Sequence, residues 1–319
     1  MQSQSQKFLV TGVAGFIGSV VACRLADRGH KVVGIDNLHS GLREAIPENI
    51  EFIELGAHSP LTMSKLEDRK FDAVLHIGGQ SGGQGSYDDP VYDLQANVQS
   101  TLLLLQLCQR IGCNRFIYAS SVSVYGDTGN NSYLIDEDVP ARPCSPYGVG
   151  KLASEQYLRI FADQFDMNCV ALRLFNTYGP GQDLGNLKQG ISSIYLAQAL
   201  DNGHIHVKGS GKRFRDLLYI DDAVEAFLRM LEPDVQGNRV YNVATGRATQ
   251  VEQLVALIGE ILGKPVSVHY EGSTPGDTFG NTGSIERIRS EAGWFPKVGL
   301  EEGMARMVEW ARGKNLQST

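Results

Sequence analysis

A tyrosine and a lysine lie four residues apart, as Tyr147 and Lys151, in a segment whose residue types favour a helix. That spacing places both side chains on one face of a helix. A free tyrosine has a pKa of about 10 and is a poor base at neutral pH. A nearby ammonium group would lower that pKa and make the phenol a general base. The pair also occurs on ordinary helix surfaces, so other residues must support this chemistry.

A serine-rich run, residues 120–126, follows the apolar segment 116–119, which reads as a strand. Ser121 and Ser123 could hydrogen-bond a substrate hydroxyl while Tyr147 removes its proton. The simpler alternative is a turn at the end of a strand. Together the serines and the Tyr/Lys pair predict a proton-transfer site.

A glycine-rich turn, Thr-Gly-Val-Ala-Gly-Phe-Ile-Gly at residues 11–18, joins an apolar strand pattern at 8–10 to a helical pattern at 19–28. Glycines at such a turn permit a sharp bend and the close approach of a pyrophosphate, which the first amides of the helix then face. An ordinary glycine-rich turn is the alternative. The residues expected to hold the pyrophosphate are Gly12, Gly15, Phe16, Ile17 and Gly18.

An acidic residue, Asp36, ends a second predicted strand at 31–35. Its offset from the glycine turn is close to the ~20 residues expected for the acid that binds an adenosine ribose. The carboxylate would accept hydrogen bonds from both ribose hydroxyls and repel a 2′-phosphate, so NAD is favoured over NADP. The cationic nicotinamide ring would also help to lower the pKa of Tyr147.

The remaining pattern predicts an α/β fold, a doubly wound parallel sheet (Rossmann) with a smaller C-terminal α/β substrate-binding cap. Ligands bind beyond the carboxyl ends of the strands in such sheets. We expect residues 1–175 to form the NAD-binding domain, with 217–245 returning to it, and 176–216 and 246–319 to form the cap. Predicted strands lie at 8–10, 31–35, 50–54, 73–77, 116–119, 169–174, 204–207, 217–220 and 240–243, and predicted helices at 19–28, 61–70, 92–111, 147–165, 191–201 and 221–231.

The composition excludes several classes of protein. The formal net charge is −7, and the lysines and arginines form no stripe that would neutralise nucleic-acid phosphates. No run approaches the ~18 apolar residues of a membrane span. The five cysteines show no paired spacing, and the first residues are polar, which favours the cytoplasm. The histidines lack metal-ligand spacing, so no metal is expected.

These motifs together resemble the extended short-chain dehydrogenases/reductases, in particular the sugar-nucleotide epimerase/dehydratase group, over nearly the whole chain. The turn at 11–18 matches the group's cofactor loop, and Tyr-Gly-Val-Gly-Lys at 147–151 matches its catalytic helix. Further signatures are His-Ile-Gly-Gly at 76–79, Arg-Leu-Phe-Asn-Thr-Tyr-Gly-Pro at 173–180 and Arg-Asp-Leu-Leu-Tyr-Ile-Asp-Asp at 215–222.

The resemblance implies roles for individual residues. Tyr147 would take the proton of the sugar 4-hydroxyl while the C4 hydride passes to NAD, with Ser121 bridging the two oxygens. Lys151 would also hold the nicotinamide ribose. The resemblance further implies a nucleotide-sugar substrate and a homodimer built through a four-helix bundle. Other residues implied to contact NAD are Asn37, Ser40, Gly41, Ala57, Ile77, Gly78, Gly79 and Asn97, and those implied to contact substrate are Asn176, Arg213, Arg215 and Asn281.

The residues before Tyr125 indicate which reaction follows the first oxidation. Family dehydratases resemble one another in carrying Asp-Glu there, and decarboxylases carry a Glu, whereas this chain has Val122 and Ser123. Without such an acid the simplest fate of the 4-keto sugar is to rotate and take the hydride back on its other face, which is 4-epimerisation of a UDP-hexose or its N-acetyl form. The alternatives are a 4,6-dehydratase, a 2-epimerase, a 4-ketoreductase and a non-catalytic NAD-binding protein.

The chain departs from the group's pattern in three places. Thr274 replaces an arginine that binds the substrate diphosphate in the group. Either Arg213 or Lys212 then holds the diphosphate, or the substrate differs from the usual UDP-hexose. Leu55-Gly56 replaces a Gly-Asp pair, which leaves Ala57 to contact the adenine through its backbone. Residues 78–85 are rich in glycine and predict a mobile loop near the nicotinamide. The small Asn281 would leave room for an N-acetyl group.

Overall fold

The centre of the molecule is a seven-stranded sheet in a computed structural model that describes residues 5–129, 134–188, 190–232, 234–272 and 278–315. Its strand order is β11-β6-β5-β4-β1-β2-β3, and each neighbouring pair is parallel. The order reverses between β1 and β4, which confirms the predicted doubly wound sheet. The strands are β1 (Lys7–Thr11), β2 (Lys31–Asp36), β3 (Glu51–Glu54), β4 (Ala73–His76), β5 (Arg115–Ser121), β6 (Asn168–Leu174) and β11 (Arg239–Val243).

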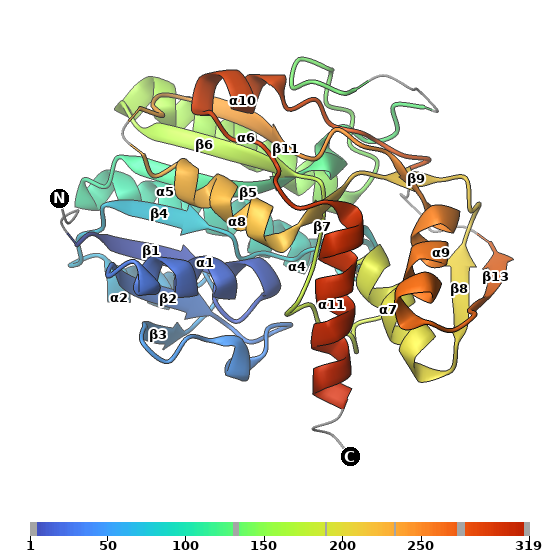
Figure 1. Cartoon of the computed structure of the whole chain (residues 1–319). Helices are drawn as coiled ribbons and strands as arrows, with labels where there is room; N and C mark the ends of the chain where they lie inside the picture. Colours follow the sequence, from blue (N-terminus) through green and yellow to red (C-terminus); the bar gives the residue numbers. More distant parts are fainter. Residues whose placement is uncertain (1–4, 130–133, 189, 233, 273–277, 316–319) are drawn as a thin grey trace.

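Helices cover both faces of the sheet (Figure 1). Alternate side chains of a strand point to opposite faces, and in β5 Ile117 belongs to one apolar core while Phe116 belongs to another. The first core contains α1 (Phe16–Asp27) and α8 (Ile220–Arg229). The second contains α2 (Pro60–Leu66), α5 (Ser100–Ile111) and α6 (Pro146–Phe165).

A smaller α/β region lies beyond the carboxyl edge of the sheet, as predicted (Figure 1). Its β8 (His204–Lys208) and β13 (Ser267–Glu271) pair in parallel, and α7 (Ile191–Asp201) packs on both β8 and α9 (Val251–Leu262). Short pairs connect this region to the sheet. They are β7 (Asn176–Tyr178) with β10 (Leu217–Tyr219), and β9 (Phe214–Arg215) with β12 (Thr249–Gln250). Two helices complete the described chain, α10 (Glu286–Ala292) and α11 (Leu300–Asn315).

The predicted helix at 92–111 is interrupted in the structure. The short α4 (Pro90–Leu94) runs into a π-helical turn, Gln95–Gln99, before α5 begins. The hydroxyls of Thr101 and Ser154 donate to the Asn97 carbonyl within this turn, so this carbonyl of the widened backbone has hydrogen-bond partners. The predicted loop at 78–85 is also shorter than expected, because α3 (Gly83–Asp88) begins inside it.

A buried ion pair fastens α6 to the sheet. Arg173 of β6 donates from Nε and Nη2 to the two carboxylate oxygens of Glu155, at 3.0 and 2.7 Å. The Ser120 hydroxyl donates to the same carboxylate at 2.5 Å. Glu155 is 4% exposed and Arg173 6%, so little solvent screens the pair. This pair fixes the catalytic helix against the ends of β5 and β6.

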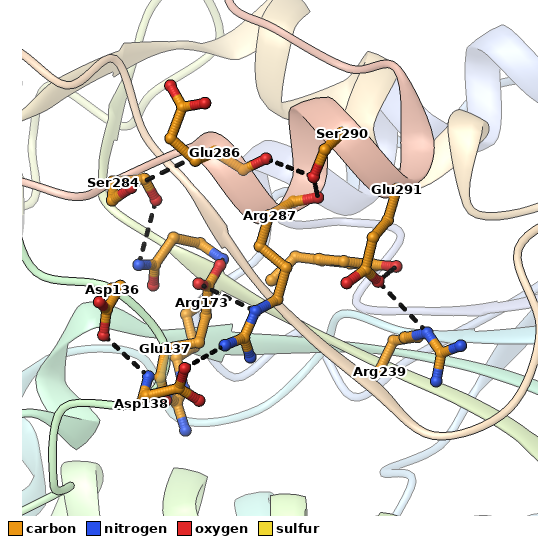
Figure 2. A network of polar contacts seen from close by, with 12 residues as sticks. Asp136, Glu137, Asp138, Arg173, Arg239, Ser284, Glu286, Arg287, Ser290 and Glu291 are labelled. Carbon is orange, nitrogen blue, oxygen red and sulfur yellow. Dashed lines mark hydrogen bonds and ion pairs between the residues drawn. The ribbon is translucent and has the colours of Figure 1, made fainter.

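The same network extends to the segment before the catalytic helix. Arg173 Nη1 also donates to the Tyr125 hydroxyl at 2.9 Å, and that hydroxyl donates to Asn242 Oδ1 at 2.7 Å. The backbone amide of Asn242 donates to Glu137 at 2.6 Å. Figure 2 shows Arg287 of α10 reaching Glu137 and Asp138, with N···O distances of 3.5 and 2.7 Å. Residues 135–138 are thereby held against β6, β11 and α10.

Replacing Arg173 should destabilise the fold far more than replacing another arginine paired to α6. Arg173→Ala leaves the Glu155 carboxylate buried without its counter-charge, which costs about 3–5 kcal/mol in the free energy of unfolding. The control is Arg159→Ala, because Arg159 pairs with Asp163 on the exposed side of α6, where such pairs contribute about 1 kcal/mol or less. Urea unfolding measures both losses, and equal losses would contradict the assigned role of the buried pair.

Candidate active site

A chain of hydrogen bonds joins the ends of β1 and β4. The Thr11 hydroxyl accepts from the amides of Ile77 and Gly78, at 3.0 and 2.8 Å, and so donates to His76 Nδ1 at 2.8 Å. His76 Nε2 then donates to the Ser100 hydroxyl at 3.1 Å. Burial, with a smaller contribution from the Lys151 charge, lowers the pKa of His76 to about 3 and keeps it neutral. The point where the strand order reverses is therefore rigidly built.

The glycines of this region allow backbone to touch backbone. Gly12 has a φ of +73°, and a Cβ placed there would lie 2.6 Å from the Cα of Gly78. A Cβ on Gly18 would lie 2.0 Å from the Gly12 carbonyl oxygen. The first turn of α1 has no side-chain cap at Gly15, so its amides are left for an anion. This cradle fits the pyrophosphate of a dinucleotide.

Asp36 is held in place at the end of β2. Its Oδ2 accepts from the amide of Ala14 at 3.1 Å, and its Oδ1 from the amide of Leu38 at 2.8 Å. Each carboxylate oxygen retains acceptor capacity for a ribose hydroxyl. Asn37 donates to the Tyr92 hydroxyl at 3.3 Å, beside the same strand end. The donors and acceptors present thus fit the adenosine half of NAD.

A cavity of about 520 Å³ lies between the carboxyl edge of the sheet and the smaller region. It collects most of the residues predicted to face nicotinamide or substrate. These are Phe16, Ile17, Ile77, Gly79, Ser121, Ser123, Tyr147, Lys151, Asn176, Arg213, Arg215 and Asn281. The other predicted cofactor residues lie outside its lining, at the strand ends, in the loops after β2 and β3 and in the π-helical turn; they are Gly12, Gly15, Gly18, Asp36, Asn37, Ser40, Gly41, Ala57, Gly78 and Asn97.

Lys151 is fixed at the floor of the cavity. Its ammonium donates to the Ala119 carbonyl at 2.9 Å and lies 5.6 Å from the centre of the Tyr147 ring. The side chain is 3% exposed, and burial lowers its pKa to about 8, while the charges of Asp93 and Glu155 oppose that change. Because this pKa lies close to neutral pH, a nearby charge of either sign changes the fraction of Lys151 that is protonated.

Tyr147 lies one turn earlier on α6, beside Ser121. The Ser121 and Ser123 hydroxyls are 3.2 Å apart, at the end of β5. Burial raises the pKa of Tyr147 to about 12, a hydrogen bond with Ser121 acts in the opposite direction, and the Asp93 charge adds to the rise. In the chain by itself the pKa of Tyr147 is therefore raised, because burial removes water from around the phenol. The lowering by Lys151 together with the nicotinamide ring stays a prediction.

The predicted substrate residues belong to two different arrangements. Arg213 and Arg215 both donate to backbone carbonyls, in the latter case to Phe214 at 2.7 Å. Asn281 donates to the Gly126 carbonyl at 2.9 Å and accepts from Thr128 at 2.7 Å. Its amide thus holds the loop after β5 against the end of the cap. Thr274, which replaces an expected arginine, lies outside the described residues.

Several lining residues carried no sequence signal. Gln182, Ser192, Gln198, His206 and Lys208 reach the cavity from the smaller region, whose approach to the sheet is a tertiary effect. The Ser192 hydroxyl and the Gln182 Oε1 are buried without a hydrogen-bond partner among the described residues. Such groups favour a polar ligand at this end of the cavity.

The glycine cradle, the ribose-binding acid and the Ser–Tyr–Lys group above one cavity define a Rossmann-fold enzyme of the short-chain dehydrogenase/reductase type. Within the described parts of the chain, no cluster of three or more His, Cys, Asp or Glu side chains is placed to hold a metal. No described helix has the length and apolar character needed to cross a membrane.

The chain belongs to the NAD dependent epimerase/dehydratase family, whose pattern it matches over residues 8–244, and NAD is its cofactor. It is 34% identical to UDP-glucose 4-epimerase of Mycolicibacterium smegmatis, over 96% of this chain and 99% of that protein. A UDP-glucose 4-epimerase from Thermotoga maritima, solved with UDP-glucose, has a TM-score of 0.91, 34% identity and coverage of 97% and 99%. A UDP-glucose 4-epimerase from Thermus thermophilus, solved with NAD, has a TM-score of 0.90, 30% identity and coverage of 96% and 99%.

Removing the charge of Asp36 should weaken NAD binding without unfolding the protein. Asp36→Asn retains one acceptor oxygen but loses charge-assisted hydrogen bonds to the ribose, so affinity should fall roughly ten- to a hundred-fold. The bound NAD that remains after purification, measured by absorbance of the acid-released cofactor, reports the change. Asp27→Asn, on the far end of α1, serves as the control, and unchanged NAD content in the Asp36 variant would overturn the assignment.

Proposed function

We propose that this protein is an NAD-dependent nucleotide-sugar 4-epimerase that acts on a UDP-hexose or its N-acetyl form. The observation that carries the proposal is the charge of the cavity. Each charged side chain in its described lining is a lysine or an arginine, namely Lys151, Lys188, Lys208, Arg213 and Arg215. The site thus offers a phenol base and cations but no described carboxylate that could deprotonate C5 or protonate a departing 6-hydroxyl.

Tyr147 is the proposed general base. Its phenol would take the proton of the sugar 4-hydroxyl and return it to the same oxygen, while Ser121 bridges the two groups. Lys151 places a positive charge beside the phenol, and such a charge favours the ionised form. NAD, when bound, supplies the reversible hydride acceptor for the sugar carbon. A 4-keto sugar that turns within the cavity before reduction gives the epimer.

The cations away from Tyr147 favour a diphosphate as the connecting group of the substrate. Arg213, Arg215 and Lys208 lie on or next to β8 and β9, whereas Lys151 lies on α6. Guanidinium groups match phosphate geometry well. The uridine nucleotide and the hexose are supported by the relatives named as UDP-glucose 4-epimerases. An N-acetyl form is supported by the small Asn281 at the cavity wall.

The alternatives differ in what they form and consume. A 4,6-dehydratase needs an acid or base that the described lining does not offer. A 2-epimerase would change the configuration at C2 instead of C4, and a 4-ketoreductase would consume reduced cofactor stoichiometrically. A non-catalytic NAD-binding protein has no need to bring Ser121, Tyr147 and Lys151 together over one cavity. The 4-epimerase reaction therefore has the best support.

A panel of UDP-, GDP-, CDP- and dTDP-sugars in deuterated water tests the proposal. The purified protein, without added cofactor, should convert one sugar to its 4-epimer with no deuterium incorporated, as read by NMR. Deuterium at C5, or a 4-keto-6-deoxy product, would contradict it.

Removing the phenolic oxygen of Tyr147 should abolish proton transfer but leave the cofactor in place. For Tyr147→Phe we expect kcat to fall by roughly 10²–10⁴-fold, the usual contribution of a positioned base. Bound NAD should stay at the level of the unmodified protein. Tyr157→Phe, farther along the same helix, is the matched control, and full activity of the Tyr147 variant would remove the phenol from the mechanism.

We propose a homodimer as the functional assembly. Large apolar side chains are exposed on α4 and on the outer side of α6, where Val91 is 66%, Leu94 56% and Val149 54% exposed. A second copy that packs the same helices against these side chains would bury them in a four-helix arrangement.

The five cysteines are free thiols, which supports the cytoplasm as the proposed location.

A charge placed on this helical surface should separate the subunits. Val149→Asp would put a carboxylate in the apolar interface, so sedimentation should show a monomer. Phe295→Asp removes an equally exposed apolar side chain elsewhere and should remain dimeric. A dimer in both variants would move the interface to another surface.

A further inference from the structure

Asp93 is a buried carboxylate that the roles described so far do not use. It lies on α4 and is 2% exposed. Its Oδ1 accepts from Asn97 Nδ2 at 3.1 Å. A Cβ placed on Gly150 of α6 would lie 3.3 Å from Asp93 Oδ2. The carboxylate therefore rests on the catalytic helix, at the residue directly before Lys151.

The other groups around Lys151 carry little net charge. Glu155 is paired with Arg173, which donates two hydrogen bonds to its carboxylate, so only part of its charge acts on Lys151. His76 is neutral because its pKa is about 3. Tyr118, whose ring centre lies 4.8 Å from the ammonium, is kept protonated because burial raises its pKa, and burial does the same for Tyr147.

Asp93 differs from these groups. In the part of the chain that the structure describes, its carboxylate forms no ion pair within 4 Å, and the Asn97 amide that donates to it is neutral. Burial raises the pKa of Asp93, while the Lys151 charge and the hydrogen bond from Asn97 act in the opposite direction and favour the ionised carboxylate. Its negative charge therefore remains available to act on the lysine through a region that contains little water.

We propose that Asp93 is the counter-charge of the catalytic lysine, a positioning residue that keeps Lys151 an ammonium beside Tyr147. Glycine at position 150 lets the carboxylate approach α6 closely enough for this role. Only the catalytic consequence rests on the proposed function, because the proton on Lys151 can be measured without substrate.

Asp93 acts on both catalytic groups in the same direction. Its charge raises the pKa of Lys151 against the burial that lowers it to about 8, and it also raises the pKa of Tyr147. Removing the charge should lower both values. The titration of the lysine and that of the phenol should therefore both move to lower pH.

Asp93→Asn separates charge from shape, because an asparagine carbonyl can still accept from Asn97. Lysine labelled with ¹³C at Cε gives one NMR signal per lysine, and Lys151→Met identifies the signal of Lys151. In the unmodified protein that signal should titrate near pH 8, as the pKa of about 8 requires. In Asp93→Asn the midpoint should fall by on the order of one pH unit.

Asp163→Asn is the matched control, since it removes one carboxylate from the exposed side of α6 and should leave the midpoint unchanged. An unchanged midpoint in Asp93→Asn would overturn the proposal. If that variant does not fold, Asp93→Ser, which is neutral, smaller and still an acceptor, gives the same comparison.

The pH profile of epimerase activity is the second readout. In Asp93→Asn both limbs should shift to lower pH, whereas a merely structural role would lower activity at every pH without a shift. A lowered Lys151 midpoint in a protein that epimerises no sugar nucleotide would leave this inference standing and refute the proposed function. Epimerase activity together with an unchanged Lys151 midpoint in Asp93→Asn would refute this inference and leave the proposed function standing.

Discussion

The hydrogen bond from the Lys151 ammonium to the Ala119 carbonyl, 2.9 Å long, is the contact on which the site depends. It joins the second turn of α6 to the last residues of β5. Because Tyr147 is one turn earlier on that helix and Ser121 two residues later on that strand, one contact sets the positions of all three. The Glu155–Arg173 pair, one turn further along α6, holds the same helix against β6. Strand and helix are thus clamped at two successive turns.

The contact between α6 and β5 requires the Lys151 ammonium to be buried, and the surrounding residues offset part of the hydration that it loses. An ammonium in a site that is 3% exposed loses most of its hydration, so its pKa falls to about 8. A carbonyl, an aromatic face and two nearby carboxylates offset that loss. Glu155 is paired with Arg173, so we infer that Asp93 is the carboxylate that acts most on the Lys151 ammonium. The balance leaves the pKa of Lys151 at about 8, so the lysine is mostly an ammonium at neutral pH.

Local patterns predicted the parallel sheet well. A strand that ends in Asp36 and a glycine turn after β1 are short-range features, and the structure places them at the edge where the strand order reverses. The π-helical turn at Asn97 could not be predicted, because it depends on hydroxyl groups from α5 and α6. Neither could the lining by Ser192 and His206, which α7 and β8 bring in from the smaller region. The raised pKa of Tyr147 likewise comes from the surroundings of the phenol, whereas a Tyr-x-x-x-Lys spacing describes only one neighbour.

In the proposed reaction one sugar carbon is oxidised and then reduced on the opposite face within a single binding event. UDP-glucose carrying deuterium at C4, incubated with the purified protein and no added cofactor, tests this most directly. The 4-epimer should form with deuterium retained at C4, because the transferred atom stays in the site. Loss of that deuterium to solvent, or a requirement for added reduced cofactor, would contradict it.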